Sequence, residues 1–381
     1  MLKQLSLFAL AGLAFAQQDD VPDLATALES TDELSTLQGV IPASVLESLS
    51  GLSDITILAP SNDAFGEVDE ETLSGLAANE GLLTALLQYH VLNGTYLSGD
   101  ISSSSAFVPT SLTNEMFTNV TGGQVVEALM MDDQVMFYTG LIANSTVTTA
   151  DVNFTGGVIH IIDRLLVIPE ITANTLTAAN LTSLRGAINA TDLFDTVNNT
   201  PDITIFAPTN VAFQNIGSAL EELTPEEITD ILTYHVVVGE DGGVGYSSTL
   251  ENGTTLVTAN GEELTITIGD GGIFVNNARV VASDVLIANG VVHVIDQVLN
   301  PSNMTIADPS SLEGEPAFED ATPASEPPYT SGQPTATTTI GQDATQAADP
   351  TADSTSMPTG AAATGAVGMG ALFGAAAVYL L

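Results

Sequence analysis

The sequence of 381 residues contains no cysteine and no tryptophan, and only four lysines and arginines stand against 47 acidic residues. Without cysteine no disulfide can form, so stability must come from a buried core. The formal charge of −43 repels phosphate groups, which excludes nucleic acid as a partner and disfavours anionic lipid headgroups. The acids lack the spacing of an EF-hand, so we expect them to provide solubility rather than a metal site.

Motifs for catalysis and cofactor binding are also missing. The chain has no H-E-x-x-H pair, no G-x-S-x-G nucleophile elbow and no P-loop. The acid pair Glu226-Glu227 imitates glycosidase carboxylates, but it suits the first turn of a helix, where negative charge is favoured and adjacent side chains point apart. We therefore expect no cofactor, no metal and no enzymatic activity.

The chain does contain a duplication. Three blocks occur twice in the same order, namely Ile55–Phe65 with Ile203–Phe213, Tyr89-His90 with Tyr234-His235, and Gly157–Asp163 with Gly290–Asp296. A repeat of this length indicates one domain present twice. A residue that both copies share serves what the copies share, which is the fold. We therefore interpret four histidines as core residues that bond to backbone or to Asn62 and Asn210: His90, His160, His235 and His293.

Local patterns predict mixed secondary structure in each copy. Residues 203–206 alternate as in a strand, and Thr224-Pro225 with Glu227 forms a capping box that begins a helix ending near His235. Asn260-Gly261 predicts a hairpin, and residues 291–295 a final strand. Helices early and strands late, without βαβ alternation, indicate an α+β fold. The first copy is longer, and we expect its extra residues in the serine stretch 102–105, because loops tolerate insertions.

The ends of the chain have their own composition. Residues 1–16 read as a signal peptide with an A-x-A cleavage site, followed by domains at 17–168 and 169–300. Residues 301–357 are rich in Ser, Thr and Pro, which predicts a disordered, O-glycosylated stalk. Residues 358–381 read as a GPI-attachment signal with a removed apolar tail, attached between Ser354 and Gly360. A retained membrane helix is the alternative.

Glycosylation signals support a secretory route. Asn-x-Ser/Thr acceptors occur at Asn93, Asn119, Asn144, Asn153, Asn180, Asn189, Asn198, Asn252 and Asn303. Each acceptor that is used must lie on the surface. Many acceptors behind a signal peptide predict a glycoprotein.

The duplicated blocks resemble a known family. Phe206–Phe213, Tyr234-His235 and Asn289–Asp296 resemble the fasciclin (FAS1) domain, and the first copy does so with Leu58 and Ser61 in place of Phe206 and Thr209. The resemblance covers residues 17–300. It implies two tandem β-wedge domains with flanking helices. With the signal peptide, stalk and anchor, the chain resembles fungal GPI-anchored fasciclin-like surface proteins.

The resemblance also implies a function in adhesion or matrix organisation, through a cell-surface or matrix protein or a glycan, with weak self-association as a further option. In animal members the Tyr-His segment and an Asp-Ile pair are linked to receptor adhesion. The matching positions here, with valine after each aspartate, are Tyr89, His90, Asp151, Tyr234, His235 and Asp284. We expect the protein on the outer face of the plasma membrane or in the cell wall.

Three alternatives remain open at this point. One is a structural wall or membrane-organising glycoprotein that binds glycan or a neighbouring protein. Another is a lumenal role at a vacuolar membrane. The short connection near Pro169 predicts a fixed or narrowly hinged domain pair, against which a freely hinged pair is the alternative.

Overall fold

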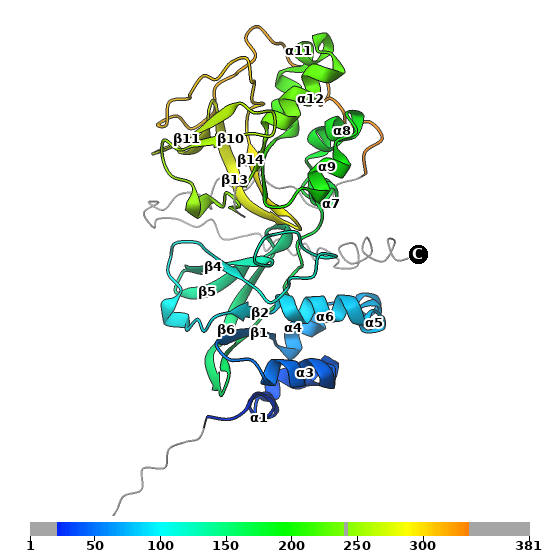
Figure 1. Cartoon of the computed structure of the whole chain (residues 1–381), viewed down its shortest axis with the longest axis vertical. Coiled ribbons are helices and arrows are strands. Elements are labelled where there is room, and N and C mark those ends of the chain that lie inside the picture. Colours follow the sequence, from blue (N-terminus) through cyan, green and yellow to red (C-terminus); the bar gives the residue numbers. More distant parts are fainter. Residues whose placement is uncertain (1–20, 240–242, 335–381) are drawn as a thin grey trace, which may run out of the picture.

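The structure is a computed structural model that describes residues 21–239 and 243–334. The two sequence copies form two domains placed one after the other (Figure 1), and each combines helices with a set of strands. The predicted α+β class is therefore confirmed. The predicted signal peptide, Ser354, Gly360 and the apolar tail lie outside the described residues. Within the described ranges, no helix has the length and apolar character needed to cross a membrane.

The first domain begins with short helices and ends with strands. Its helices are α1 (Leu24–Glu29), η1 (Asp32–Leu34), α2 (Ser35–Val40), α3 (Ala43–Ser50), α4 (Asn62–Gly66), α5 (Glu70–Ala78), α6 (Glu80–Tyr89), η2 (Ser98–Asp100) and η3 (Gly140–Ile142). Its strands are β1 (Ile55–Pro60), β2 (Val91–Asn93), β3 (Ala106–Pro109), β4 (Val125–Met131), β5 (Gln134–Tyr138), β6 (Asn144–Phe154) and β7 (Gly157–Ile162).

The second domain repeats this order. Its helices are α7 (Thr172–Ala178), α8 (Thr182–Ala190), α9 (Phe194–Asn199), α10 (Asn210–Asn215), α11 (Gly217–Glu222), α12 (Pro225–Tyr234) and η5 (Ser247–Thr249). Its strands are β8 (Ile203–Pro208), β9 (Val236–Val238), β10 (Thr255–Val257), β11 (Glu263–Gly269), β12 (Gly272–Val275), β13 (Ala278–Ile287) and β14 (Gly290–Ile295). The predicted strand, capping box, hairpin and final strand of this copy are all present.

Each domain has one seven-stranded sheet, in the order β2-β1-β7-β6-β5-β4-β3 or β10-β11-β12-β13-β14-β8-β9. The pairs β1–β7 and β14–β8 are parallel, whereas the other pairs are antiparallel. Isolated bridges between Leu92 and Thr110, and between Val237 and Thr258, bring the first and last strands of each sheet together. Each sheet is therefore almost closed on itself.

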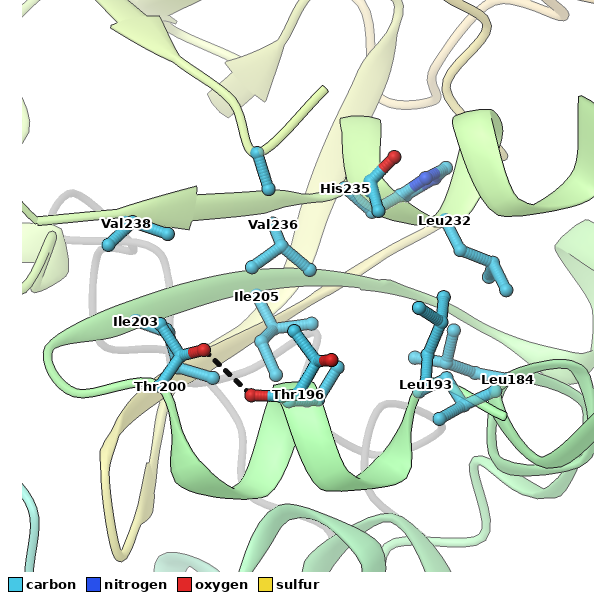
Figure 2. Close-up of a pocket in the computed structure, with 14 residues that line it drawn as sticks. Leu184, Leu193, Thr196, Thr200, Ile203, Ile205, Leu232, His235, Val236 and Val238 are labelled. Carbon is cyan, nitrogen blue, oxygen red and sulfur yellow. Dashed lines mark hydrogen bonds between the residues drawn. The ribbon is translucent and has the colours of Figure 1, made fainter. Parts of the chain in front are cut away.

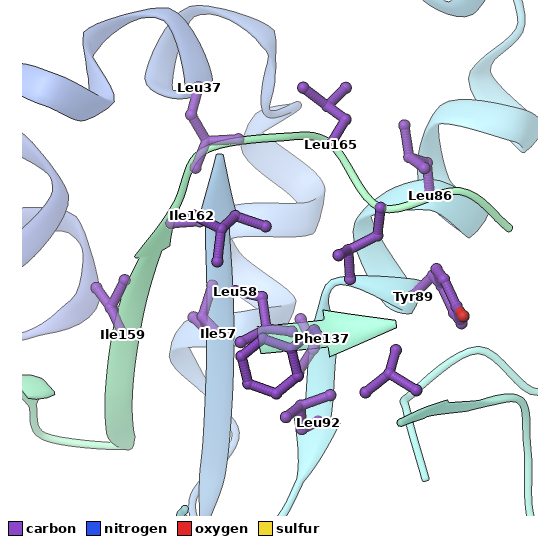
Figure 3. Packing of buried hydrophobic residues seen from close by; sticks show 14 of the residues in the cluster. Leu37, Ile57, Leu58, Leu86, Tyr89, Leu92, Phe137, Ile159, Ile162 and Leu165 are labelled. Atoms are coloured by element: carbon purple, nitrogen blue, oxygen red, sulfur yellow. The ribbon is translucent and has the colours of Figure 1, made fainter. Parts of the chain in front are cut away.

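The helices lie on one side of each sheet (Figure 1), and the core fills the space between them. All residues of β1, β8 and β14 are buried, as expected for strands covered on both faces. In the first domain Leu58, Phe137 and Tyr89 come from different elements and pack together at its centre (Figure 3). This packing takes the place that disulfides hold in many secreted domains.

The extra residues of the first copy form a different loop from the predicted one. Residues 110–124 connect β3 to β4, where the second copy uses only 258–262 to connect β10 to β11. The serine stretch 102–105 is therefore not the insertion. The long loop reaches the second domain, where the Thr121 amide and hydroxyl donate to Asp202 at 2.7 and 2.6 Å. The extra length therefore lets the loop contact the second domain, which its composition does not predict.

The long loop belongs to an interface between the domains that contains both hydrogen bonds and apolar contacts. Further bonds run from Asn119 to Ala288 and Asn199, and from Gln124 to Ile287. Phe107 stacks on Tyr246 with ring centroids 4.1 Å apart. These contacts support the prediction of a fixed or narrowly hinged pair.

The predicted stalk is closer to the second domain than its composition suggests. Residues 301–334, here called the strap, lie along that domain (the orange segment of Figure 1), with Ala307 and Ala317 buried. The strap backbone also hydrogen-bonds to the domain. For example, the Glu315 amide donates to the Asn277 carbonyl, and the Glu315 carbonyl accepts from the Asn277 side-chain amide. The strap therefore packs on the second domain although it follows the boundary predicted at residue 300, which stays a prediction. Small residues let the strap lie flat, and hydrogen bonds to the domain replace those it would make to water. Residues 335–357 lie outside the described part.

Glycine at position 186 of α8 provides a test of the strap contact. A Cβ on Gly186 would lie 2.0 Å from the Tyr329 carbonyl oxygen, whereas among the described residues nothing lies within 4 Å of a Cβ on its counterpart, Gly39. We expect Gly186→Ala to lower the free energy of unfolding by about 1–3 kcal/mol through overpacking. Gly39→Ala raises it by up to about 1 kcal/mol, because alanine favours a helix. Thermal unfolding of both variants measures this, and equal effects would contradict the strap contact.

Candidate functional site

The tyrosines of both Tyr-His pairs point into the core. Tyr89 and Tyr234 end α6 and α12 and are fully buried. The Tyr89 hydroxyl donates to the Val125 carbonyl at 2.9 Å, and the Tyr234 hydroxyl donates to the Glu263 carbonyl at 3.0 Å. Burial raises the pKa of both phenols. Each tyrosine therefore ties the end of a helix to the strand that follows the β3–β4 or β10–β11 connection.

The histidines that follow these tyrosines make a second tie. Nδ1 of His90 lies 2.7 Å from the Leu86 carbonyl, and its Nε2 accepts from the Leu166 amide at 3.0 Å. His235 makes the same bonds to Ile231 and Leu299, at 2.7 and 3.0 Å. The ring is neutral, with the proton on Nδ1, because the amide needs an acceptor. Burial lowers the pKa of both histidines to about 4, against a small opposing effect of the carbonyl bond.

The other two histidines pin the last strand to a bulge in its neighbour. Nε2 of His160 lies 2.8 Å from the Tyr96 carbonyl, and the Asp151 amide approaches its Nδ1 at 3.3 Å. His293 makes the same contacts with Gly245 and Asp284, at 2.7 and 3.3 Å. The bulge residues Asp151 and Asp284 have positive φ angles of 60° and 61°. This conformation costs energy outside glycine, and the histidine bonds stabilise it.

The bulge aspartates use their carboxylates within the fold. Asp151 accepts from the Ser98 amide at 2.9 Å and from the Ser98 hydroxyl. Asp284 is buried and accepts from the Ser247 amide at 2.8 Å. The six adhesion candidates (Tyr89, His90, Asp151, Tyr234, His235 and Asp284) therefore share inward hydrogen bonds. Their link to adhesion stays a prediction, and these geometries give them a scaffold role.

Of the two partners expected for the histidines, backbone groups are the ones bonded, and the shared asparagines make other contacts. Asn62 accepts from the Thr36 amide at 2.8 Å and donates to the Asp32 carbonyl. Asn210 binds Ser183 and Asn180 in the same way. The asparagines thus fix the start of α2 and α8, and in both copies the histidines bond to backbone instead. The sequence alone does not show whether the histidines bond to the asparagines or to backbone groups.

The described part of the chain was also compared with the arrangements that hold a metal ion. Residues 21–239 and 243–334 contain no group of three or more histidines and acids placed to hold a metal ion. Both nitrogens of each histidine already contact backbone groups. The acid pair Glu226-Glu227 lies in the first turn of α12, where Glu227 closes the capping box with Thr224.

An apolar pocket recurs at one position in both domains, beside the Tyr-His segment. In the second domain it has a volume of about 80 Å³ and lies between α8, α9, α12 and the strands β8 and β9 (Figure 2). In the first domain it has a volume of about 40 Å³. Matching residues line both pockets: Leu37 and Leu184, Ile41 and Ile188, Ile57 and Ile205, Leu87 and Leu232, His90 and His235, and Val91 and Val236. The pocket is a property of the fold, and each is large enough only for a small apolar group.

The pocket rims differ between the domains. In the second domain Val238, at the end of β9, lines the pocket and is 41% exposed. The matching residue of the first domain is Asn93, which is polar and a glycosylation candidate. The second pocket therefore presents the more apolar rim.

The glycosylation candidates divide by exposure. Four are exposed, namely Asn93, Asn153, Asn189 and Asn252. The other five are partly buried, namely Asn119, Asn144, Asn180, Asn198 and Asn303. Asn119 also donates its side-chain amide to the Asn199 carbonyl across the domain interface. Occupancy of each acceptor stays a prediction.

An acidic group lies at the domain interface. Glu127 of β4 is flanked across the sheet by Phe107 and Tyr138, and Phe107 stacks on Tyr246 of the second domain. Burial raises the pKa of Glu127 to about 7, although a bond from the Ser105 hydroxyl acts in the opposite direction; the charge of Asp284 raises it further. The buried position therefore favours the protonated form of the Glu127 carboxyl over the ionised form.

Comparison with known proteins agrees with the duplication. The family model described as Fasciclin domain matches residues 23–169 and 179–301. A fasciclin-like arabinogalactan protein of Arthroderma benhamiae is 39% identical over 294 residues, which are 75% of this chain and 68% of that protein. Periostin of Homo sapiens is 27% identical over 278 residues, which are 71% of this chain and 31% of periostin.

One solved structure is also similar. It is a FAS1 domain pair from the insect cell adhesion molecule Fasciclin I, 24% identical, covering 70% of this chain and 96% of that chain with a TM-score of 0.34.

The buried histidines predict a loss of stability in acid. Because burial lowers the folded pKa of His235 from 6.5 to about 4, its stabilisation is complete above pH 6.5 and is lost as the pH falls through 4. We expect His235→Leu to cost about 2–4 kcal/mol at pH 7, since it leaves a buried amide and carbonyl without partners. Chemical denaturation from pH 7 to pH 4 should show this deficit shrinking. A deficit that is the same at every pH would argue against a buried neutral ring.

Glu127 predicts the opposite dependence on pH. Its folded pKa is raised from 4.5 to about 7, so its stabilisation is complete below pH 4.5 and is lost as the pH rises through 7. Relative to the wild type, Glu127→Gln should gain about 1–3 kcal/mol between pH 4.5 and pH 7. Denaturation curves at the two pH values measure this. Glu115→Gln, on the exposed part of the long loop, is the control and should show no such gain.

Proposed function

Because the chain belongs to the fasciclin domain family, we propose that it is a non-enzymatic adhesion protein of the cell surface or extracellular matrix. The proposal rests on one observation: the same apolar pocket occurs in each domain, and the two domains pack against each other. Two weak contact sites held at a fixed spacing bind a repetitive surface more tightly than either does alone. The partner would be a surface or matrix protein or a glycan.

The chemistry of the described residues is consistent with a role in binding. The four histidines and the bulge aspartates Asp151 and Asp284 are engaged in hydrogen bonds within the fold. The apolar rims of the two pockets are one surface feature that differs between the domains. The rim residue Val238 is the strongest of these, because it is apolar, exposed and part of the pocket.

The proposed location is the outer face of the plasma membrane or the cell wall, through a GPI anchor attached between Ser354 and Gly360. The support is the sequence pattern of residues 301–381 together with the strap. Since the strap follows the second domain to residue 334, a spacer would begin there rather than at residue 301. An anchored spacer would present the domain pair away from the bilayer.

Adhesion through the second pocket can be tested with paired variants of the full chain. We expect Val238→Asp to weaken attachment of expressing cells about tenfold, because a charge at an apolar contact is costly to desolvate. Val211→Asp is the control, since Val211 is 53% exposed on α10 and does not line the pocket. Attachment is measured against cells that lack the gene.

One result would contradict the adhesive function, and another would contradict only the assigned contact surface. Cells without the gene that attach as well as wild-type cells would remove the adhesive function. Equal attachment of both variants would leave adhesion standing but remove Val238 from the contact surface. A glycan array and a pull-down from wall extract then separate a wall-organising role from cell adhesion.

A further inference from the structure

One face of β4 packs against the second domain. Val125 and Glu127 are two residues apart on this strand, so their side chains lie on the same face of the sheet. Val125 packs with Tyr246 and Leu286 of the second domain in one apolar cluster. Phe107 lies opposite Glu127 across the sheet and stacks on Tyr246. Glu127 is therefore a carboxyl of the interface between the domains.

Two carboxylates of the second domain lie at the same interface. Asp284 on β13 is buried, and its charge acts on Glu127. Asp202, which precedes β8, is also buried and accepts from Thr121 of the long loop. Asp284 and Asp202 each accept from a backbone amide, whereas Glu127 accepts only from the Ser105 hydroxyl among the described residues. Of the three carboxyls, Glu127 has the fewest donors to stabilise its charged form.

The phenols of this interface cannot neutralise the carboxylates. Tyr138 is the partner of Glu127 on β5, and Tyr246 is 8% exposed. Burial raises the pKa of both phenols, and the charges of Asp202 and Asp284 raise that of Tyr246 further. The Tyr246 hydroxyl has no hydrogen-bond partner among the described residues. Both groups therefore stay uncharged beside the acids.

The cations of the described residues are engaged elsewhere. The three arginines contact Glu67, Gln333 of the strap and the Gly271 carbonyl, in the order Arg164, Arg185 and Arg279. His293 approaches the Asp284 amide, but its ring nitrogens already contact that amide and the Gly245 carbonyl. An ionised Glu127 thus faces Asp284 without a counter-ion. Moving the domains apart would let water reach the carboxylate and relieve this cost.

We propose that the contact between the two domains is a pH-sensitive hinge, in which protonated Glu127 keeps the interface closed and ionised Glu127 opens it. The short connection near Pro169 is the pivot. The surfaces that separate are the β3–β5 face of the first domain and the Tyr246 segment of the second. The inference goes beyond the adhesive role, because it concerns the orientation of the domains and holds whether or not the protein binds a partner.

The sign and size of the effect follow from the titration of Glu127. Its pKa is raised from 4.5 to about 7 in the closed interface, and opening returns it towards 4.5. Closure is therefore fully favoured below pH 4.5 and is lost as the pH rises through 7. If the whole shift comes from closure, the ratio of closed to open molecules falls by about 100-fold between pH 4.5 and pH 8.

The test measures the distance between the domains in the full-length secreted protein. Because the chain has no cysteine, Ser103→Cys and Ser248→Cys can carry two spin labels at defined positions. Both serines are exposed, one on each side of the interface. Electron spin–spin distance measurements should show one short distance at pH 4.5. At pH 8 we expect a second, longer distance to appear.

The controls separate Glu127 from general repulsion among the acids. Glu127→Gln cannot ionise and should keep the short distance at both pH values. Glu115→Gln, on the exposed part of the long loop, should open like the wild type. Circular dichroism confirms that each variant is folded. A wild-type distance that does not change with pH overturns the proposal, and so does opening of Glu127→Gln to the same extent as the wild type.

Discussion

The bond pair made by one buried imidazole in each domain is the contact on which the rest of the architecture depends. His90 joins the last turn of α6 to Leu166, and His235 joins α12 to Leu299. Each ring thereby links the helical layer to the chain that leaves the final strand. A neutral ring can donate on one side and accept on the other, which no aliphatic side chain can do. The adjacent tyrosine ties the same helix end to the far strands, so that one dipeptide connects three parts of the domain.

Because the domain is duplicated, contacts in one copy can be compared with contacts in the other. Contacts that appear in both copies, such as the histidine bonds, the aspartate bulges and the asparagine bonds, belong to the fold. Contacts in one copy alone have another purpose. The long β3–β4 connection occurs only in the first domain and locks the pair together through Thr121 and Asp202. The strap occurs only beyond the second domain. The individual features of this protein are thus found in its loops and its C-terminal extension.

Much of the fold could be predicted because local signals and the global arrangement agree. Residues 203–206, the capping box at Thr224 and the hairpin at Asn260-Gly261 form as their patterns indicate. Two features were not predictable from composition. The strap has the composition of an extended segment, and its contacts depend on glycines at positions 186 and 217 that lie far away in sequence. The bonding partners of the histidines depend on which backbone groups lack a helical partner, which only the tertiary arrangement determines. The candidate sites were located by the family resemblance, but their inward orientation was not.

The acidic composition gains a more specific meaning from the comparison of the two domains. If acids served only solubility, they would be spread without regard to the strap. Instead, the surface that the strap crosses is neutral at the positions of Val211, Asn215 and Gly217, whereas the matching surface of the first domain is acidic at Asp63, Glu67 and Asp69. The neutral residues at these positions reduce like-charge repulsion where the acidic strap lies against α10 and the start of α11. The charge pattern of the two domains therefore matches the side on which the strap packs.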